Sequence, residues 1–170
     1  MIVMINQINI IMEQQNVKDT SVFESTSKNK DRAVKQVIVF RKDLLKGDHA
    51  IRKGKFAAQV AHGSLGALLK LAWRFRDEKD INHIDFRYGD DSGLKKWLDG
   101  IFTKVCLSVD NDGELINLYN NIKDNSEIPC ALITDCGLTE FHGVPTNTCI
   151  GIGPWWSDEI DKFTGNLKLL

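Results

Sequence analysis

Several polar side chains with the chemistry needed to hydrolyse an ester lie at the ends of strand-like segments in this chain. Lys53 lies in a basic stretch before a helical pattern, and Asp135 ends an apolar run. Thr139 follows four residues after this acid, and Thr146 and Thr148 precede another apolar run. A carboxylate can orient and deprotonate water, and an ammonium group can stabilise an oxyanion. Together these residues predict attack by water on an ester.

Each of these residues also has an ordinary structural interpretation. Asp135 could cap a turn, because Gly137 permits a positive φ two residues later. The threonines could be residues of an edge strand. The combination of lysine, carboxylate and hydroxyl groups at strand ends favours the chemical interpretation over three separate structural ones.

The segment before the helical pattern carries a local excess of positive charge, although the formal net charge of the chain is only −1. Backbone N–H groups at a helix start have no partner inside the helix and favour an anion. A solvated charged loop is the alternative. The position of the charges favours a phosphate-bearing substrate, an RNA above all. The basic side chains of residues 41–55 are Arg41, Lys42, Lys46, Arg52, Lys53 and Lys55, against the acids Asp43 and Asp48.

Other chemistries are excluded by spacing. The four cysteines form no Cys-x-x-Cys pair, and no histidine stands at ligand spacing, so we expect no metal, no cofactor and a reducing cytoplasm. A phosphate-binding loop before Gly54-Lys55 would need a glycine where His49 stands and a Ser or Thr where Phe56 stands. His62 is more typical of a structural histidine than of a catalytic one.

The elements that must position these residues alternate between strand and helix. An uninterrupted apolar run at Gln36–Phe40 predicts a strand buried on both faces. This alternation predicts a single α/β domain, a three-layer α/β/α sandwich around a small four-stranded mixed sheet. We expect strands near 36–40, 103–109, 130–133 and 148–152, the last ended by Gly153-Pro154, and helices from 53 to 75, near 94–98, from 111 and from 157, with a loop over 77–91.

The first 32 residues differ from the remainder. Met1 to Met12 is apolar but too short to span a bilayer, and it lacks the basic start of a signal peptide. Glu13 to Arg32 is polar, with little periodic apolar content. We expect residues 1–32 to be a disordered N-terminal extension and residues 33–170 to be the domain.

Five segments, in order, resemble the archaeal and eukaryotic-type (type 2) peptidyl-tRNA hydrolases over about residues 35–170. The resemblance implies hydrolysis of the ester between peptide and tRNA, a homodimer, a cytoplasmic location and no membrane. The alternative is a non-catalytic RNA-binding or interaction module on the same fold. The segments are Lys35-Gln36-Val37-Ile38-Val39; Lys53-Gly54-Lys55-x-Ala57-Ala58-Gln59-x-x-His62; Asp135-x-Gly137-x-Thr139; Ile150-Gly151-Ile152-Gly153-Pro154; and Asp161-Lys162-x-Thr164-Gly165-x-Leu167-Lys168-Leu169.

Residue roles follow from the same resemblance. It implies catalytic roles for Lys53, Asp135, Thr139 and Thr148. Beside these residues, we expect the acceptor end of peptidyl-tRNA to be bound by Arg41, Lys55, Gln59, His62 and Thr146. The chain departs from the family pattern in its longer 43–53 loop, in Cys136 where the family has alanine, in the loop before Thr148, and in an insertion around residues 82–93.

Overall fold

The computed structural model describes residue 29, residues 31–47 and residues 50–170. The expected disorder of the N-terminal extension therefore lies almost wholly outside the described residues. Arg32, which we assigned to that extension, is described, and it contacts the domain. Its guanidinium donates to Asp158 at 2.8 Å and to Glu159 at 2.6 Å, and it lies 4.5 Å from the ring centre of Trp156.

A mixed sheet is built around the buried apolar run, which forms β1 (Val34–Arg41). β1 pairs in parallel with β4 (Lys104–Val109) and antiparallel with β6 (Thr146–Trp156). β5 (Cys130–Asp135) pairs with the far side of β6, and β7 (Lys168–Leu169) pairs with β4. The strand order is β5-β6-β1-β4-β7. The predicted single α/β domain with a mixed sheet is confirmed, but the prediction of four strands is wrong.

The fifth strand was missed because it is only two residues long. Leu169 and Lys168 pair with Leu107 and Ser108, and the amide of Leu170 donates to the carbonyl of Cys106 at 3.1 Å. A segment this short has no periodic pattern of its own. Its strand conformation comes from the hydrogen-bonding edge that β4 offers.

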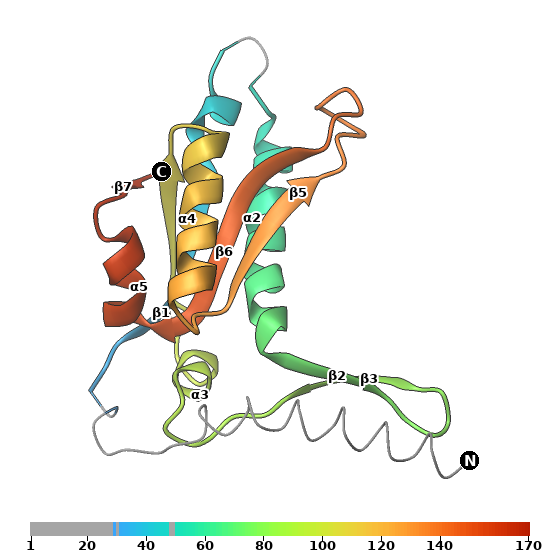
Figure 1. Ribbon diagram of the computed structural model, residues 1–170, viewed down its shortest axis with the longest axis vertical. Helices are drawn as coiled ribbons and strands as arrows, with labels where there is room; N and C mark the ends of the chain where they lie inside the picture. Colours follow the sequence, from blue (N-terminus) through green and yellow to red (C-terminus); the bar gives the residue numbers. More distant parts are fainter. Residues whose placement is uncertain (1–28, 30, 48–49) are drawn as a thin grey trace.

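The two faces of β1 pack against different helices. Val37 and Val39 belong to one core cluster, with α4 and α5 side chains, whereas Ile38 and Phe40 belong to another, with α2 side chains. This alternation is expected because successive side chains of a strand point to opposite faces. Figure 1 shows α4 and α5 together on the viewer's side of the sheet and α2 beyond it. These helices are α2 (Lys53–Leu68), α4 (Asp112–Asn125) and α5 (Ser157–Thr164).

Small residues let α2 approach the sheet closely. Gly63 is buried against β6, and a Cβ there would meet the sulfur of Cys149 at 3.2 Å. A Cβ on Gly151 would overlap the backbone carbonyl of Gly63. Helix and strand are therefore nearly in backbone contact, which fixes the height of α2 side chains relative to β5 and β6.

The prediction that the first helix extends to Phe75 is wrong. α2 ends at Leu68, a short 3₁₀ turn η4 (Leu69–Leu71) follows, and β2 (Ala72–Arg76) pairs antiparallel with β3 (Asn82–Phe86). Trp73 and Phe75 alternate with arginines, which is a strand period that we interpreted as helical spacing. The predicted 77–91 loop therefore contains β3. Figure 1 shows this hairpin reaching away from the main sheet.

The remaining elements follow the sequence more closely. The capping pattern at α4 is confirmed: the Asn111 side chain accepts from the Glu114 amide at 3.0 Å. Gly153-Pro154 does not end β6, because the strand resumes after a bulge and pairs Trp155 and Trp156 with the start of β1. Among the described residues, the other two helical segments are η3 (Lys42–Leu45) and α3 (Gly93–Leu98). Within the described ranges no helix has the length and apolar character needed to cross a membrane.

Candidate active site

Asp135 is the last residue of β5, and its carboxylate accepts hydrogen bonds from three directions. The Gly137 amide donates to Oδ1 at 2.8 Å, while Lys55 Nζ and Gln59 Nε2 donate to Oδ2 at 2.5 and 2.8 Å. Gly137 has φ +80, and a Cβ there would collide with the backbone of Val144. The turn after β5 therefore requires glycine, as predicted, and it aims an N–H group at the acid.

The helical donors come from one face of α2. Lys55 and Gln59 are four residues apart, so their side chains lie one turn apart on the same side of the helix. The Lys55 ammonium also donates to Thr139 Oγ1 at 3.2 Å and lies 5.4 Å from the ring centre of Phe141. The structure thus brings together Asp135, Thr139 and a lysine of the basic segment.

These contacts set the ionisation of the acid. Burial by itself raises the pKa of Asp135, but the hydrogen bonds from Lys55, Gly137 and Gln59 and the charge of Lys55 together hold that pKa below its usual value. The carboxylate is therefore anionic at neutral pH. A carboxylate offers about four lone-pair positions, and three are filled, so Oδ1 keeps one position for a further donor such as water.

Gln59 connects the carboxylate to a buried threonine. Thr148 Oγ1 donates to Gln59 Oε1 at 2.7 Å, and the exposed fractions of Thr148 and Gln59 are 0% and 2%. The structure therefore places Thr148 beneath the site, where Gln59 separates it from the Asp135 carboxylate.

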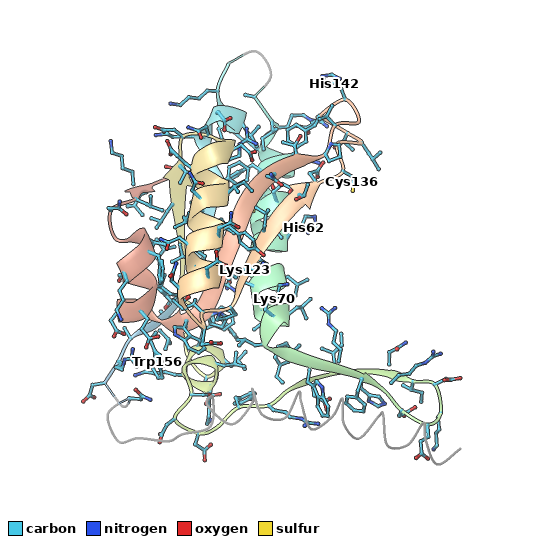
Figure 2. All side chains as sticks on the ribbon, viewed as in Figure 1. His62, Lys70, Lys123, Cys136, His142 and Trp156 are labelled. Carbon is cyan, nitrogen blue, oxygen red and sulfur yellow. The ribbon has the colours of Figure 1, made fainter. Side chains whose placement is uncertain are left out.

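A cavity of about 340 Å³ opens beside these groups. Asp135 and Thr139 line one side of it, and Lys55, Gln59 and His62 of α2 line the other. Figure 2 shows His62 on α2 and Cys136 just beyond β5, on the same side of the molecule. Ile133, Thr134, Cys136 and Leu138 complete the lining.

Three residues assigned to the site from the sequence lie at its margin. Lys53 is the exposed first residue of α2, and among the described residues its side chain makes no hydrogen bond or ion pair. Thr146 pairs with Asp135 across β5 and β6, and its hydroxyl donates to the Val144 carbonyl at 2.9 Å. Arg41 donates to Asp43, Asp112 and the Asn147 carbonyl, with lengths of 2.7, 3.2 and 2.9 Å.

Glu140, which the sequence did not point to, contacts the start of α2. Glu140 accepts from the Arg52 amide at 3.0 Å and from Arg52 Nε at 2.8 Å. The hydrogen bond from the Arg52 amide, with the side-chain bond and the charge of Arg52, lowers the pKa of Glu140. This carboxylate at the helix start ties the loop after β5 to α2. No sequence signal links residues 52 and 140, which are far apart in the chain.

The cysteines offer no reactive thiolate in the core. Burial raises the pKa of Cys149 to about 12 and also raises the pKa values of Cys106 and Cys130. Cys136 is exposed and lines the cavity with His62, but within the described part of the chain no hydrogen bond joins the two. The described residues also hold no His, Cys, Asp and Glu cluster suited to a metal ion.

Comparison with known proteins gives a consistent result. The family model described as "Peptidyl-tRNA hydrolase PTH2" matches residues 34–170. A peptidyl-tRNA hydrolase of Methanopyrus kandleri is 39% identical over 80% of this chain and 97% of its own length. One from Methanothermobacter thermautotrophicus is 37% identical over 81% and 100%, and one from Thermococcus onnurineus is 38% identical over 80% and 97%. A solved structure of an Agrobacterium protein of unknown function covers 81% of this chain and 97% of its own, with 11% identity and a TM-score of 0.41, too distant to carry an argument.

Proposed function

Because the chain belongs to the peptidyl-tRNA hydrolase PTH2 family and hydrolyses the ester of peptidyl-tRNA, we propose that this hydrolysis takes place at Asp135. The observation that supports this most strongly is the carboxylate itself. It is anionic, it is held by three donors, and it keeps an open position on Oδ1 at the edge of a cavity. A water molecule on that oxygen would lie beside the space available to the ester.

The reaction needs two proton transfers, one from water to Asp135 and one from Asp135 to the leaving ribose oxygen. Water, with its proton accepted by Asp135, attacks the ester carbonyl carbon and forms a tetrahedral oxyanion. Collapse of this intermediate breaks the bond from the carbonyl carbon to the terminal ribose oxygen. The protonated Asp135 returns its proton to that ribose oxygen. The products are a peptide with a free carboxylic acid, which releases its proton to solvent at neutral pH, and a tRNA with a free terminal hydroxyl, and no acyl-enzyme forms.

Lys55 is the residue best placed to stabilise the oxyanion. Its ammonium lies 2.5 Å from Asp135 Oδ2 and lines the cavity. Movement of this ammonium from the carboxylate to the substrate oxygen would supply positive charge where negative charge develops. It would also remove a donor from Asp135 and so raise the pKa of the base when it is needed. Thr139, which already contacts Lys55 at 3.2 Å, would guide this exchange.

The basic margin of the site would hold the tRNA. Lys53 is exposed at the start of α2, and Lys46 is exposed in the preceding loop, so both are free to contact phosphates of the acceptor end. His62 also lines the cavity and would face the aminoacyl residue. The contacts of Arg41 and Thr146 support a role in positioning the start of β6. No described contact favours the non-catalytic RNA-binding module.

The wider expectations also become proposals here. Helices packed on both faces of β1 support a three-layer arrangement of the domain. An uncharged, exposed strip on α2, made of Ala57, Ala58, Ala61 and Leu65, supports a homodimer through that helix. A tRNA substrate and unpaired cysteines support a cytoplasmic location. Sedimentation of the purified chain tests the dimer, since a monomer at micromolar concentration contradicts it.

The function is tested by release of a labelled, N-acetylated amino acid from tRNA. Unacetylated aminoacyl-tRNA is the matched control, because it carries the same ester without the blocked amine. We expect turnover of the acetylated substrate with wild-type protein and loss of that turnover in Asp135→Asn. Equal turnover by Asp135→Asn would move the site away from this cavity.

A further inference from the structure

Thr148 has no access to the substrate. Its exposed fraction is 0%, and it is not among the residues that line the cavity. A side chain without exposed surface cannot touch the ester or the attacking water. Any effect of Thr148 on hydrolysis must therefore pass through a neighbouring side chain.

That neighbour is Gln59. The Thr148 hydroxyl has one proton to donate, and its nearest acceptor is Gln59 Oε1 at 2.7 Å; the Ile133 carbonyl is more distant, at 3.3 Å. Because Oε1 is held in this way, Nε2 points to Asp135 Oδ2 at 2.8 Å. Gln59 is itself 2% exposed, so water cannot readily replace either bond.

The opposite orientation of the amide is disfavoured at both ends. It would place Oε1 against Asp135 Oδ2, so that two acceptors would face each other without a proton between them. At the other end Nε2 would face Thr148, whose proton would be left with the weaker contact to Ile133. The acceptor-only carboxylate thus selects the orientation in which Gln59 donates to the acid, and the Thr148 hydroxyl strengthens that preference by donating to Oε1.

We propose that Thr148 and Gln59 form a buried relay that holds the Asp135 carboxylate in its reactive orientation, so that both are positioning residues for hydrolysis. The relay matters most when Lys55 turns from the carboxylate to the substrate. Gln59 is then the donor that remains on Oδ2, and Gly137 remains on Oδ1. The carboxylate keeps its plane while its open position receives water. This proposal rests on the proposed role of Asp135 as the base.

The relay also predicts a pH effect, because a donor to the carboxylate lowers the pKa of Asp135. Loss of the Gln59 donor should raise that pKa and move the acid-side fall in activity to higher pH. The other charged or titratable groups around Asp135 are Lys55 and His62 from α2, Cys136 and Glu140 from the loop after β5, and Arg41 at the end of β1.

The first test is Thr148→Val, which removes the hydroxyl and keeps the shape. We expect kcat to fall about tenfold with KM unchanged, in line with the loss of one buried hydrogen bond, and we expect Thr148→Ser to restore it. Thr164→Val is the matched control. Thr164 is 1% exposed and donates to the Ile160 carbonyl at 3.0 Å, but it lies on α5, outside the cavity. Wild-type kcat in Thr148→Val would overturn the relay.

A double-mutant cycle separates the relay from a general packing defect. In a Gln59→Met background, where the relay is already broken, Thr148→Val should change kcat less than twofold (roughly the error of additivity). If the fold losses in kcat of the two single variants multiply in the double variant, Thr148 does not act through Gln59. Methionine keeps the length of the glutamine side chain, so this variant is expected to fold.

A titration that needs no turnover distinguishes the relay from the proposed role of Asp135. In protein labelled with ¹³C at aspartate carboxyl groups, the Asp135 signal should titrate at higher pH in Thr148→Val and in Gln59→Met than in wild type. An unchanged titration refutes the relay, whatever the activity of Asp135→Asn. A shifted titration with full activity in Asp135→Asn would instead keep the relay and refute Asp135 as the base.

Discussion

Replacement of Asp135 by asparagine removes the proposed base and nearly preserves its shape. Lys55 Nζ, Gln59 Nε2 and the Gly137 amide all donate to this carboxylate. An asparagine has one acceptor oxygen, so at best two of these donors keep their partner and one faces an NH₂ group. Such an unpaired donor costs about 1–3 kcal/mol. Asp135→Asn should therefore be measurably less stable than wild type.

This loss of stability is too small to explain a large loss of activity. Typical domains unfold with about 5–15 kcal/mol, so even the least stable of them would keep about 2 kcal/mol after the change. At 25 °C that leaves roughly 97% of the molecules folded. Loss of a general base, in contrast, lowers kcat by roughly 10²–10⁴. The two effects differ by more than an order of magnitude and are separable on one preparation.

The assay is single-turnover hydrolysis of N-acetyl-aminoacyl-tRNA, with a thermal melt on the same sample. We expect the melting temperature to fall by roughly 2–4 °C for each kcal/mol lost and kcat to fall at least 100-fold, roughly the lower limit for a base. Asp161→Asn is the matched control, because Asp161 accepts from Lys35 at 2.6 Å on α5, away from the cavity. Asp135→Asn with a lowered melting temperature and near-normal kcat would show that the carboxylate is structural and would refute the mechanism.

Four further predictions concern the charged groups. Lys55→Ala should lower kcat by roughly 10²–10³ and raise the pKa of the catalytic carboxylate, so the acid-side fall in the pH–rate profile moves to higher pH; an unmoved fall would separate the lysine from the base. Lys53→Ala should raise KM and leave kcat near wild type, and a kcat defect as large as that of Lys55→Ala would reverse these two assignments. In the double variant Lys46→Ala/Lys53→Ala, the slope of log affinity against log salt concentration should become shallower by about one for each lost phosphate contact. An unchanged slope would place the RNA elsewhere. A chain starting at Arg32 should melt roughly 2–4 °C above one starting at Ala33; equal melting temperatures would show that the contacts of Arg32 with Asp158, Glu159 and Trp156 add nothing.

The sequence by itself determined the parts of this protein that local patterns encode. The apolar run of β1 predicted a strand buried on both faces, and Asn111 with Glu114 predicted the start of α4. Asp135 and Gly137 at the end of an apolar run predicted a sharp turn that presents an acid. These patterns succeed because periodicity, caps and turns depend on residues a few positions apart.

Local patterns failed where a segment is stabilised by distant residues. β7 is a strand because the edge of β4 is available to it. β2 was assigned to a helix because the apolar spacing of Leu71 and Phe75 fits either period, and only pairing with β3 selects the strand.

Only the tertiary structure decided which groups surround the Asp135 carboxylate. Lys53 and Lys55 are equivalent in sequence, yet Lys55 lies 2.5 Å from Asp135 whereas the exposed Lys53 does not line the cavity, because the two are not on the same face of α2. The sequence suggested a catalytic role for the Thr148 hydroxyl, but the side chain is fully buried in the fold. Both outcomes depend on how closely α2 packs on β6, where Gly63 nearly touches Gly151. Hydrogen bonds weaken steeply over a few tenths of an ångström, and this packing distance is set by residues far apart along the chain.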